Sequence, residues 1–292
     1  MALDAKGRVA WVSLAAAAVL TSAKLIAGLA TDSIGVLSEA LHSALDLVAA
    51  VMTVFAISRS GRPADADHQF GHGKYENLSA LFETLLLVAT CAWIVWEAVE
   101  RLEEGRAPES SPWAFAVMLL SIAVDVQRSR ALMRVAREYG SQALEADALH
   151  FSSDVISSCA VIAGLALSAA GLGWADPLAA LAVAGVVLVA AVRLIGRSVD
   201  ALLDRAPAGA REAVRTRIGS VEGVIGEAEV RVRPQGPVLH VDAVVHVDGR
   251  STLDEAHAVA SRVEDAVRES FPGADVNVHV EPRRGCDPGG GS

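Results

Sequence analysis

The chain has 292 residues, of which 52% are hydrophobic, and its 35 acidic side chains outnumber its 25 lysines and arginines. The formal net charge of −10 excludes a nucleic-acid-binding protein, which needs a basic surface, and suits a surface that attracts cations. The hydrophobic residues gather in runs of about 20, the length of a membrane-spanning helix.

Six apolar runs follow one another in chain order, and they predict six transmembrane helices. The fourth run is short, and we expect its helix to continue through Asp125–Ala136, with the polar residues there facing protein or the membrane edge. The runs are Val9–Ala30, Ile34–Ile57, Leu78–Val99, Trp113–Val124, Ala148–Leu172 and Pro177–Ile195.

Lysine and arginine predict the orientation, because they gather on the cytoplasmic side of a membrane protein. They are frequent at the N-terminus, after the second run and between the fourth and fifth. The opposite loops hold only Arg101 and Arg106. Both termini are therefore predicted to be cytoplasmic, which requires an even number of spans and supports six.

The chain from about Asp204 onward is charged and has no spanning run. Residues 223–234, 237–249 and 274–282 are rich in β-branched residues and alternate as strands do, whereas Ala210–Ile218 and Thr252–Phe271 are predicted to be helices. The order α-β-β-α-β predicts a ferredoxin-like α+β domain. A domain of about 75 residues buries only a modest core, so association with a second copy would stabilise it.

One short motif, Ala-Leu-His-x-x-x-Asp, occurs twice inside predicted spans, at residues 40–46 and 148–154. Residues four apart share a helix face, so His42 points with Asp46 and His150 points with Asp154. A carboxylate in the membrane costs roughly 2.5–3.5 kcal/mol and needs a partner. Two imidazoles and two carboxylates suit a tetrahedral ion of the zinc type. The alternative is a pair of interhelical hydrogen bonds, which the duplication disfavours.

Two acidic residues stand beside the motifs. Asp147 precedes His150 by three residues and Glu39 precedes His42 by three. Either could line the cytoplasmic approach to a metal site, but we interpret both as ordinary interfacial charges.

Several segments together resemble the cation diffusion facilitator family. They are "SIGVLSEALHSALD", "PADADHQFGHGKYENL", "SQALEADALHFSSDV", "LLDRA" and a C-terminal "HVEP", and they run in the expected order from Lys24 to Pro282. The resemblance implies a dimeric six-span exporter of divalent metals, usually driven by proton exchange. It places the transport site at His42, Asp46, His150 and Asp154. Histidine at the first position implies a preference for zinc; iron, manganese, cobalt and cadmium are the alternatives.

The loop after the second span holds Asp65, His68 and His72, with Gly71 and Gly73 allowing a tight backbone. The resemblance implies a zinc site here; the alternative is a solvated polar loop. Lys74 and Asp204 match positions that pair in some family members and tie the spans to the tail. For Lys74 the alternative is an ordinary surface lysine.

The tail also carries candidate ligands. The resemblance implies regulatory metal here, and His257 and His279 match its pattern, while Glu281 stands where aspartate is commoner. Ala228 and Val244 replace histidines of some members, so a full binuclear cluster is not expected. We predict one site that uses His257 and His279, and the alternative is simple surface histidines. The remaining candidate ligands are His240, Asp242 and His246.

Together these features predict a six-span transmembrane domain (1–204), a cytoplasmic ferredoxin-like domain (205–283) and a disordered end (284–292). The predicted function is zinc efflux in exchange for protons across a bacterial plasma (inner) membrane by a homodimer, with no enzymatic activity, organic cofactor or nucleic-acid partner. Two rivals belong to other classes. A membrane metalloenzyme would keep an open metal position and a general base, and a membrane-anchored metal sensor would not need ligands inside the membrane.

Overall fold

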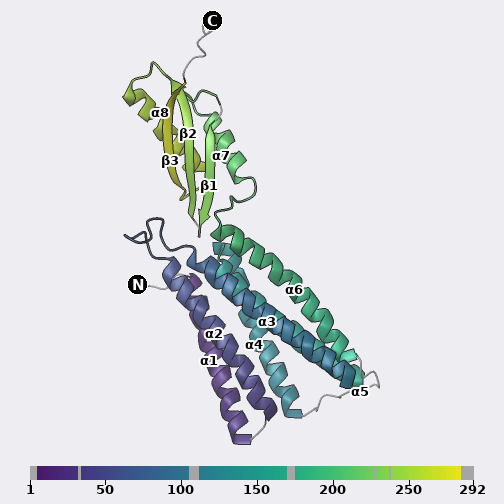
Figure 1. The fold of residues 1–292 in the computed structure, drawn as a ribbon. Helices are drawn as coiled ribbons and strands as arrows, with labels where there is room; N and C mark the ends of the chain where they lie inside the picture. Colours follow the sequence, from purple (N-terminus) through teal and green to yellow (C-terminus); the bar gives the residue numbers. More distant parts are fainter. Residues whose placement is uncertain are drawn as a thin grey trace. The chain divides into compact units, whose positions relative to one another are not determined.

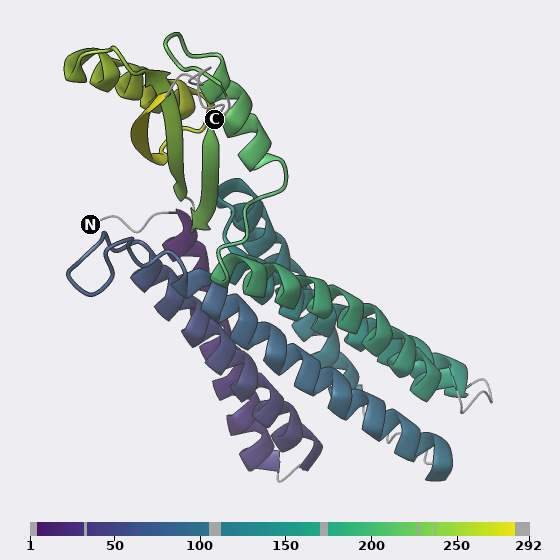
Figure 2. The same cartoon turned by 45° about the horizontal axis from the view of Figure 1, so that its top comes forward.

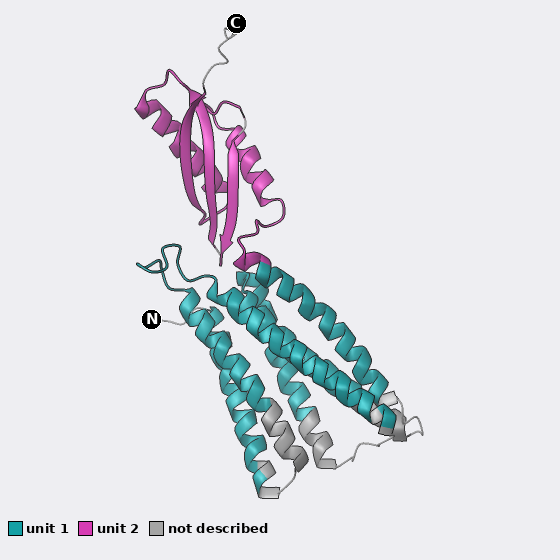
Figure 3. Cartoon of the chain, viewed as in Figure 1, with its two compact units in different colours: residues 1–199 teal, residues 200–292 magenta. Residues whose placement is uncertain are grey.

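The computed structural model describes residues 5–31, 34–104, 112–169, 175–226, 228–236 and 238–283. The side chains of residues 30–42, among them the predicted ligand His42, are outside the described part, and so are residues 284–292, which were predicted to be disordered. The chain divides into two compact units, residues 1–199 and 200–292 (Figure 3).

The first unit is made of long helices that run lengthwise beside one another (Figures 1 and 2). Four of them, α1, α2, α3 and α6, contain described stretches long and apolar enough to cross a membrane. The predicted continuation of the fourth helix beyond Val124 is confirmed, because α4 is one helix. The bounds are α1 (Ala5–Thr31), α2 (Ile34–Ser60), α3 (Tyr75–Glu104), α4 (Pro112–Tyr139), α5 (Gln142–Ala169) and α6 (Ala175–Leu202).

Small and bulky apolar side chains alternate where the helices of the first unit meet. Alanines let the backbones approach closely, and larger residues such as Leu132 and Phe151 fill the space between them. A second cluster joins α3 to α6. The main cluster, from α1, α2, α4 and α5, consists of Ala10, Val54, Ile57, Leu132, Ala136, Leu144, Ala148 and Phe151.

One face of the polar half of α4 packs against protein. Arg128 is only 8% exposed, and its guanidinium carbon lies 3.6 Å from the ring centroid of Phe151. The same guanidinium donates hydrogen bonds to the carbonyl oxygen of Ser13 at 3.1 Å and to its hydroxyl at 3.0 Å. These contacts explain how α4, a helix of low mean hydropathy, fits inside the bundle, because the buried charge of Arg128 has partners within the protein.

At one end of the bundle, the buried carboxylate of Glu76 joins four segments. It accepts hydrogen bonds from Lys6 of α1 at 2.6 Å and from Ser60 at the end of α2 at 2.9 Å. Its second oxygen accepts a hydrogen bond from Ser141, just before α5. Glu76 is 5% exposed, so these donors replace the water that an ionised carboxylate would otherwise bind.

Replacing Glu76 tests whether this junction stabilises the bundle. Glu76→Gln keeps the size but leaves the ammonium of Lys6 partly buried without its anion, which should reduce the free energy of unfolding by about 3 kcal/mol. Chemical unfolding of the full chain in detergent micelles measures it. The matched control is Glu103→Gln on the same helix, where the side chain is exposed. Equal free energies of unfolding for Glu76→Gln and Glu103→Gln would contradict a stabilising role of Glu76 at this junction.

The second unit is a small α+β domain with the predicted element order. Its three strands form a sheet of order β1-β2-β3, in which β1 and β2 are antiparallel and β2 and β3 are parallel. The helix α8 supplies the crossover that parallel neighbours require. The elements are α7 (Ala210–Gly219), β1 (Glu229–Gln235), β2 (Val238–Asp248), α8 (Leu253–Ser270) and β3 (Asp275–Arg283).

One face of this sheet is covered and the other is open. Val259, Val263 and Val267 of α8 pack with valines of all three strands and with α7, and together they form the core of the unit. The opposite face is lined by polar side chains that the register places in rows across the strands, such as Arg231 beside Asp242. Strand alternation therefore separates the core from the strand histidines of the tail, His240, His246 and His279.

The N-terminus of α8 carries a capping box. Thr252 Oγ1 accepts a hydrogen bond from the backbone N–H of Glu255, and Glu255 Oε2 accepts one from the backbone N–H of Thr252 at 2.8 Å. That backbone hydrogen bond to Thr252 holds the pKa of Glu255 below its ordinary value of 4.5. The ionised form is thus the one that the folded state favours.

The capping box makes the end of α8 sensitive to pH. Because the pKa of Glu255 is lowered on folding, its stabilisation is complete above pH 4.5 and is lost as the pH falls through the lowered pKa. We expect the protection factors of the first amides of α8, corrected for intrinsic exchange, to fall over that range. Glu255→Gln should abolish the pH dependence. An unchanged profile in the variant would contradict the role of the carboxylate.

Candidate metal centre

The second histidine-aspartate motif meets an aspartate of the first motif between α2 and α5. His150 Nε2 lies 2.8 Å from Asp46 Oδ1 and 3.8 Å from Asp154 Oδ2. One ligand atom from each of the three residues lies within 4.8 Å of the other two. His150 is buried, and the side chains of Asp46 and Asp154 are 14% and 19% exposed. The three groups form a cluster that is largely shielded from solvent.

The spacing of these atoms fits a tetrahedral cation. Ligand bonds of about 2.0–2.2 Å at tetrahedral angles place neighbouring ligand atoms about 3.4 Å apart. The two distances from His150 Nε2, 2.8 and 3.8 Å, lie on either side of that value. Small rotations of the two carboxylates would therefore create a site with an imidazole and two oxygens, which suits zinc and neighbouring divalent ions.

The fourth predicted ligand, His42, is on α2, and its side chain lies outside the described part of the chain. The helix that carries it continues through Asp46 without interruption. The role of His42 as the fourth ligand therefore stays a prediction.

Charged residues that the sequence analysis did not single out surround this cluster. Asp125 of α4 lies 3.6 Å from Arg128 in the same helix, and its charge acts on Asp46 and Asp154. Lys24 of α1 donates a hydrogen bond to Ser43 at 2.8 Å. Asp125 and Arg128 lie on α4 and Lys24 lies on α1, whereas the ligands lie on α2 and α5, so no local sequence pattern connects them. Their signal in the sequence was only the presence of charges inside or directly after apolar runs.

Two further carboxyl groups are buried deeper in the bundle. Glu83 of α3 accepts hydrogen bonds from Thr53 at 2.6 Å and Ser79 at 2.8 Å. Asp147 of α5 accepts one from Ser13 of α1 at 3.3 Å. Asp147 is 0% exposed, so our interpretation of it as an ordinary interfacial charge does not fit its surroundings.

The loop between α2 and α3 brings its three predicted ligands together. Asp65 Oδ2 lies 3.4 Å from His72 Nε2, and Asp65 Oδ1 lies 3.5 Å from His68 Nδ1. The two imidazole rings are 4.4 Å apart between centroids. His72 is buried, and its Nδ1 has no hydrogen-bond partner among the described residues. One ligand atom from each residue lies within 4.8 Å of the others, as in the helix cluster.

The backbone of the loop explains this convergence. Asp65 Oδ1 accepts hydrogen bonds from the backbone N–H groups of Asp67 and His68 at 3.0 and 2.7 Å. The N–H of His68 is the main reason that the pKa of Asp65 is lowered. Gly71 has a φ of +82°, which a side chain would strain. The turn thus keeps Asp65 ionised while it returns His72 towards it.

The predicted ligands of the tail are spread over two faces of the second unit. His279 Nε2 lies 3.6 Å from Glu281 Oε1, and His246 Nε2 lies 3.8 Å from Glu281 Oε2. His240 Nδ1 instead lies 3.0 Å from Asp275.

His257 is exposed on α8, which packs on the opposite face of the sheet from His279. Asp242, exposed on the open face, accepts a weak hydrogen bond from Asn277 at 3.4 Å. Within one chain, His257 and His279 are therefore not brought together.

The pairing of Lys74 with Asp204 stays a prediction, because the two residues belong to different units. Within the second unit, Asp204 Oδ2 lies 3.9 Å from Arg233 Nη1. Its backbone has a φ of 60°, which marks the turn where α6 ends.

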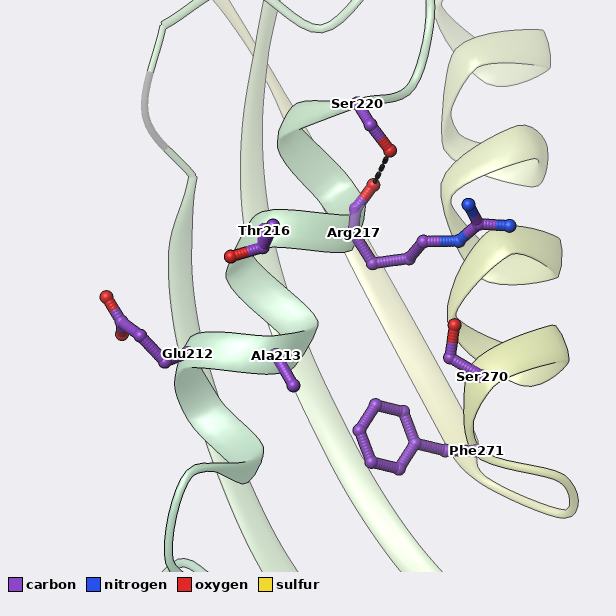
Figure 4. A pocket seen from close by; sticks show the side chains of 7 residues that line it. All are labelled: Glu212, Ala213, Thr216, Arg217, Ser220, Ser270 and Phe271. Atoms are coloured by element: carbon purple, nitrogen blue, oxygen red, sulfur yellow. Dashed lines mark hydrogen bonds between the residues drawn. The ribbon is translucent and has the colours of Figure 1, made fainter.

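A pocket between α7 and the end of α8 offers no comparable chemistry (Figure 4). Arg217 pairs with Glu269 at 2.5 Å, and the hydroxyl of Ser220 donates to the backbone carbonyl of Arg217 at 2.7 Å. Phe271 closes one side of it. Among the described residues, metal-ligand clusters occur at the two sites of the first unit and not in this pocket.

Both units of the chain are similar to known protein families. Residues 10–203 match the family model of the cation efflux transmembrane domain, and residues 206–283 match that of the cation efflux protein cytoplasmic domain. The cation-efflux pump FieF of Yersinia enterocolitica is 34% identical over 270 residues, covering 91% of this chain and 89% of that protein. FieF of Serratia proteamaculans is 35% identical over 277 residues, covering 94% and 91%. A solved MamM C-terminal domain structure matches with 23% identity and a TM-score of 0.25, over 26% of this chain and 96% of that one.

The loop cluster can be tested by metal occupancy. Asp65→Asn removes the charged oxygen that both histidines face, so we expect zinc to bind the loop roughly 10- to 100-fold more weakly. Isothermal titration of the full chain in detergent, on a background of Asp154→Ala, measures this. Asp67→Asn is the matched control, because its side chain is exposed two residues away. Equal affinities in the two variants would show that the loop is only a solvated turn.

Proposed function

Since the chain belongs to the cation diffusion facilitator family, we propose that it exports zinc from the cytoplasm in exchange for protons. Membership follows from the two matched domains and from the cation-efflux relatives that cover almost the whole chain. The chain is thus an integral membrane transporter of divalent cations and not an enzyme. The metal ion, the coupling to protons and the residues involved are the proposal.

The cluster of Asp46, His150 and Asp154 carries this proposal. It joins α2 to α5 inside the helical unit, where the carboxylates are removed from most of the solvent. A cation that binds there repays the loss of hydration of two negative charges, so the site favours binding over an empty, ionised state. We propose that His42 completes the set as the fourth ligand.

The donor set supports zinc as the substrate. Imidazole nitrogen suits zinc, whereas iron(II) and manganese accept sites with more oxygen ligands. With His42 and His150 the site has two nitrogens and two carboxylate oxygens, enough for tetrahedral coordination. Iron, manganese, cobalt or cadmium is the alternative substrate of the same site. The FieF relatives are cation-efflux pumps, so family membership does not by itself choose among these ions.

Proton exchange follows from the chemistry of the ligands. Imidazole binds metal only in its neutral form, so protons and metal compete for the same site. In the proposed cycle, the ionised carboxylates and neutral histidines bind zinc from the cytoplasm, and the helices rock to open outward. Protons then displace the metal and accompany the return, because an empty site with two charged carboxylates is disfavoured in the membrane.

The accessory sites have a supporting role in this proposal. Asp65, His68 and His72 would hold a second zinc beside the start of α3. In the tail, the pair of His279 and Glu281 on the open face would meet His257 only from another copy, which agrees with a homodimer and one tail site. The arginines and lysines in the loops support a cytoplasmic location of both termini, and the bacterial origin of the relatives supports an inner-membrane location.

The membrane-anchored sensor is disfavoured by membership in a family of cation transporters. A sensor would bind zinc without moving it, so transport distinguishes the two directly. The metalloenzyme is excluded by the family.

Transport by the purified protein tests the proposal. In proteoliposomes with a pH gradient, wild-type protein should move zinc one way and protons the other. Asp154→Ala should slow zinc movement more than about a hundredfold, because it removes a ligand. Asp265→Ala on α8, also an aspartate but 77% exposed, is the matched control. Zinc binding without flux would favour the sensor. Flux of manganese or iron without flux of zinc would show that the transported ion is not zinc.

A further inference from the structure

Glu83 and Asp147 are buried carboxyl groups outside the ligand set, and each has an unused oxygen. Glu83 is 2% exposed and Asp147 is 0% exposed. The hydrogen bonds of Thr53 and Ser79 both reach Glu83 Oε1, and that of Ser13 reaches Asp147 Oδ2. Among the described residues, Glu83 Oε2 and Asp147 Oδ1 have no hydrogen-bond partner. Such orphaned oxygens are uncommon in a buried site and call for a ligand.

The helices bring these two carboxyl groups to the same level of the bundle. Ala80, three residues before Glu83, and Ala146, next to Asp147, belong to one buried cluster together with Leu194 of α6. Both carboxyl groups are therefore buried where α3 packs against α5. Asp147 precedes His150 by three residues on α5, which puts it on the same side of that helix as the metal cluster.

The charged groups around the pair do not neutralise two carboxylates. Arg128 of α4 faces Asp147, but it also pairs with Asp125 at 3.6 Å. Asp46 of α2 adds a further negative charge. α1 faces the pair with the hydroxyl of Ser13, and α6 with the apolar side chain of Leu194. Without metal, two ionised groups here would leave a buried negative charge unpaired, which is strongly disfavoured.

We propose that Glu83 and Asp147 share one proton and that this proton is one of those exchanged for the metal. The proposal rests on the zinc–proton exchange argued above and adds a proton site separate from the ligands. When a divalent cation binds at His150, its charge favours ionisation of the pair, so the carboxylic acid O–H bond breaks and the proton passes to water. When the metal leaves, a proton returns to the pair.

This arrangement couples the two ions by charge alone. Because linkage is reciprocal, a metal that expels the proton is itself bound more weakly while the proton is present. The hydrogen bonds from Thr53 and Ser79 stabilise the ionised form of Glu83 and keep it ready to release its proton. The pair therefore acts as a positioning and charge-balancing site, and it does not touch the transported ion.

Proton release on zinc binding tests the proposal. The full chain is titrated with zinc chloride in weakly buffered detergent solution, and the protons released per bound zinc are counted. Glu83→Gln keeps the size and fixes the group neutral, so we expect about one proton fewer per zinc. In proteoliposomes, zinc flux down its own gradient should persist, while its stimulation by a pH gradient should fall.

Two further variants make the test decisive. Glu100→Gln, the same substitution near the other end of α3, is the matched control and should release as many protons as wild type. If Glu83→Gln does not fold, Thr53→Val serves instead: it removes a donor to the ionised carboxylate, so zinc-linked proton release should shift to higher pH.

The outcomes separate this proposal from the exchange on which it rests. An unchanged proton count in Glu83→Gln, or an unshifted profile in Thr53→Val, would overturn the shared proton and assign all exchanged protons to the ligands. Wild-type protein that transports zinc without moving protons would overturn the exchange itself.

Discussion

The architecture of the helical unit depends on placing negative charge where water is scarce. Asp46 and Asp154 lie on two different helices, and each lies within 4 Å of one imidazole, that of His150. Carboxylates in such surroundings are stable only when a cation, a proton or a set of donors offsets their lost hydration. The α2–α5 contact must therefore be close. The neighbouring helices must turn polar side chains inward, as α4 does with Asp125 and Arg128.

Sequence spacing predicted the parts of this arrangement that lie on single helices. The repeat of histidine and aspartate four residues apart indicated which side chains share a face, and the structure brings Asp46, His150 and Asp154 together. It could not show that Glu83 and Asp147 are both buried where α3 packs against α5, because nothing local relates residues that are 64 positions apart. The buried state of Asp147 depends on Ser13 and Arg128, and these contacts exist only after the helices have packed.

Sequence spacing predicted how the ligands of the loop come together, but it could not predict how the ligands of the tail are arranged. The loop ligands lie within eight residues, and the hydrogen bonds of Asp65 to the following backbone N–H groups are a local property of aspartate in turns, so spacing was a good guide. In the tail, the positions of His257 and His279 depend on which face of the sheet α8 covers. Strand register sets the side of His279, and packing of valines sets the side of α8, so the two histidines of one chain are kept apart.

The polar groups of the first unit also differ in what they can do for a transported ion. The ligand cluster is partly exposed and can exchange its cation, whereas Glu83 and Asp147 are closed to solvent and surrounded by hydroxyl donors. A group that binds the metal must satisfy distance and coordination angle, but a group that responds to its charge needs only to be near in a medium of low dielectric constant. Separating the two tasks leaves the ligands free to favour one ion. The buried pair can then set how strongly that ion is linked to protons.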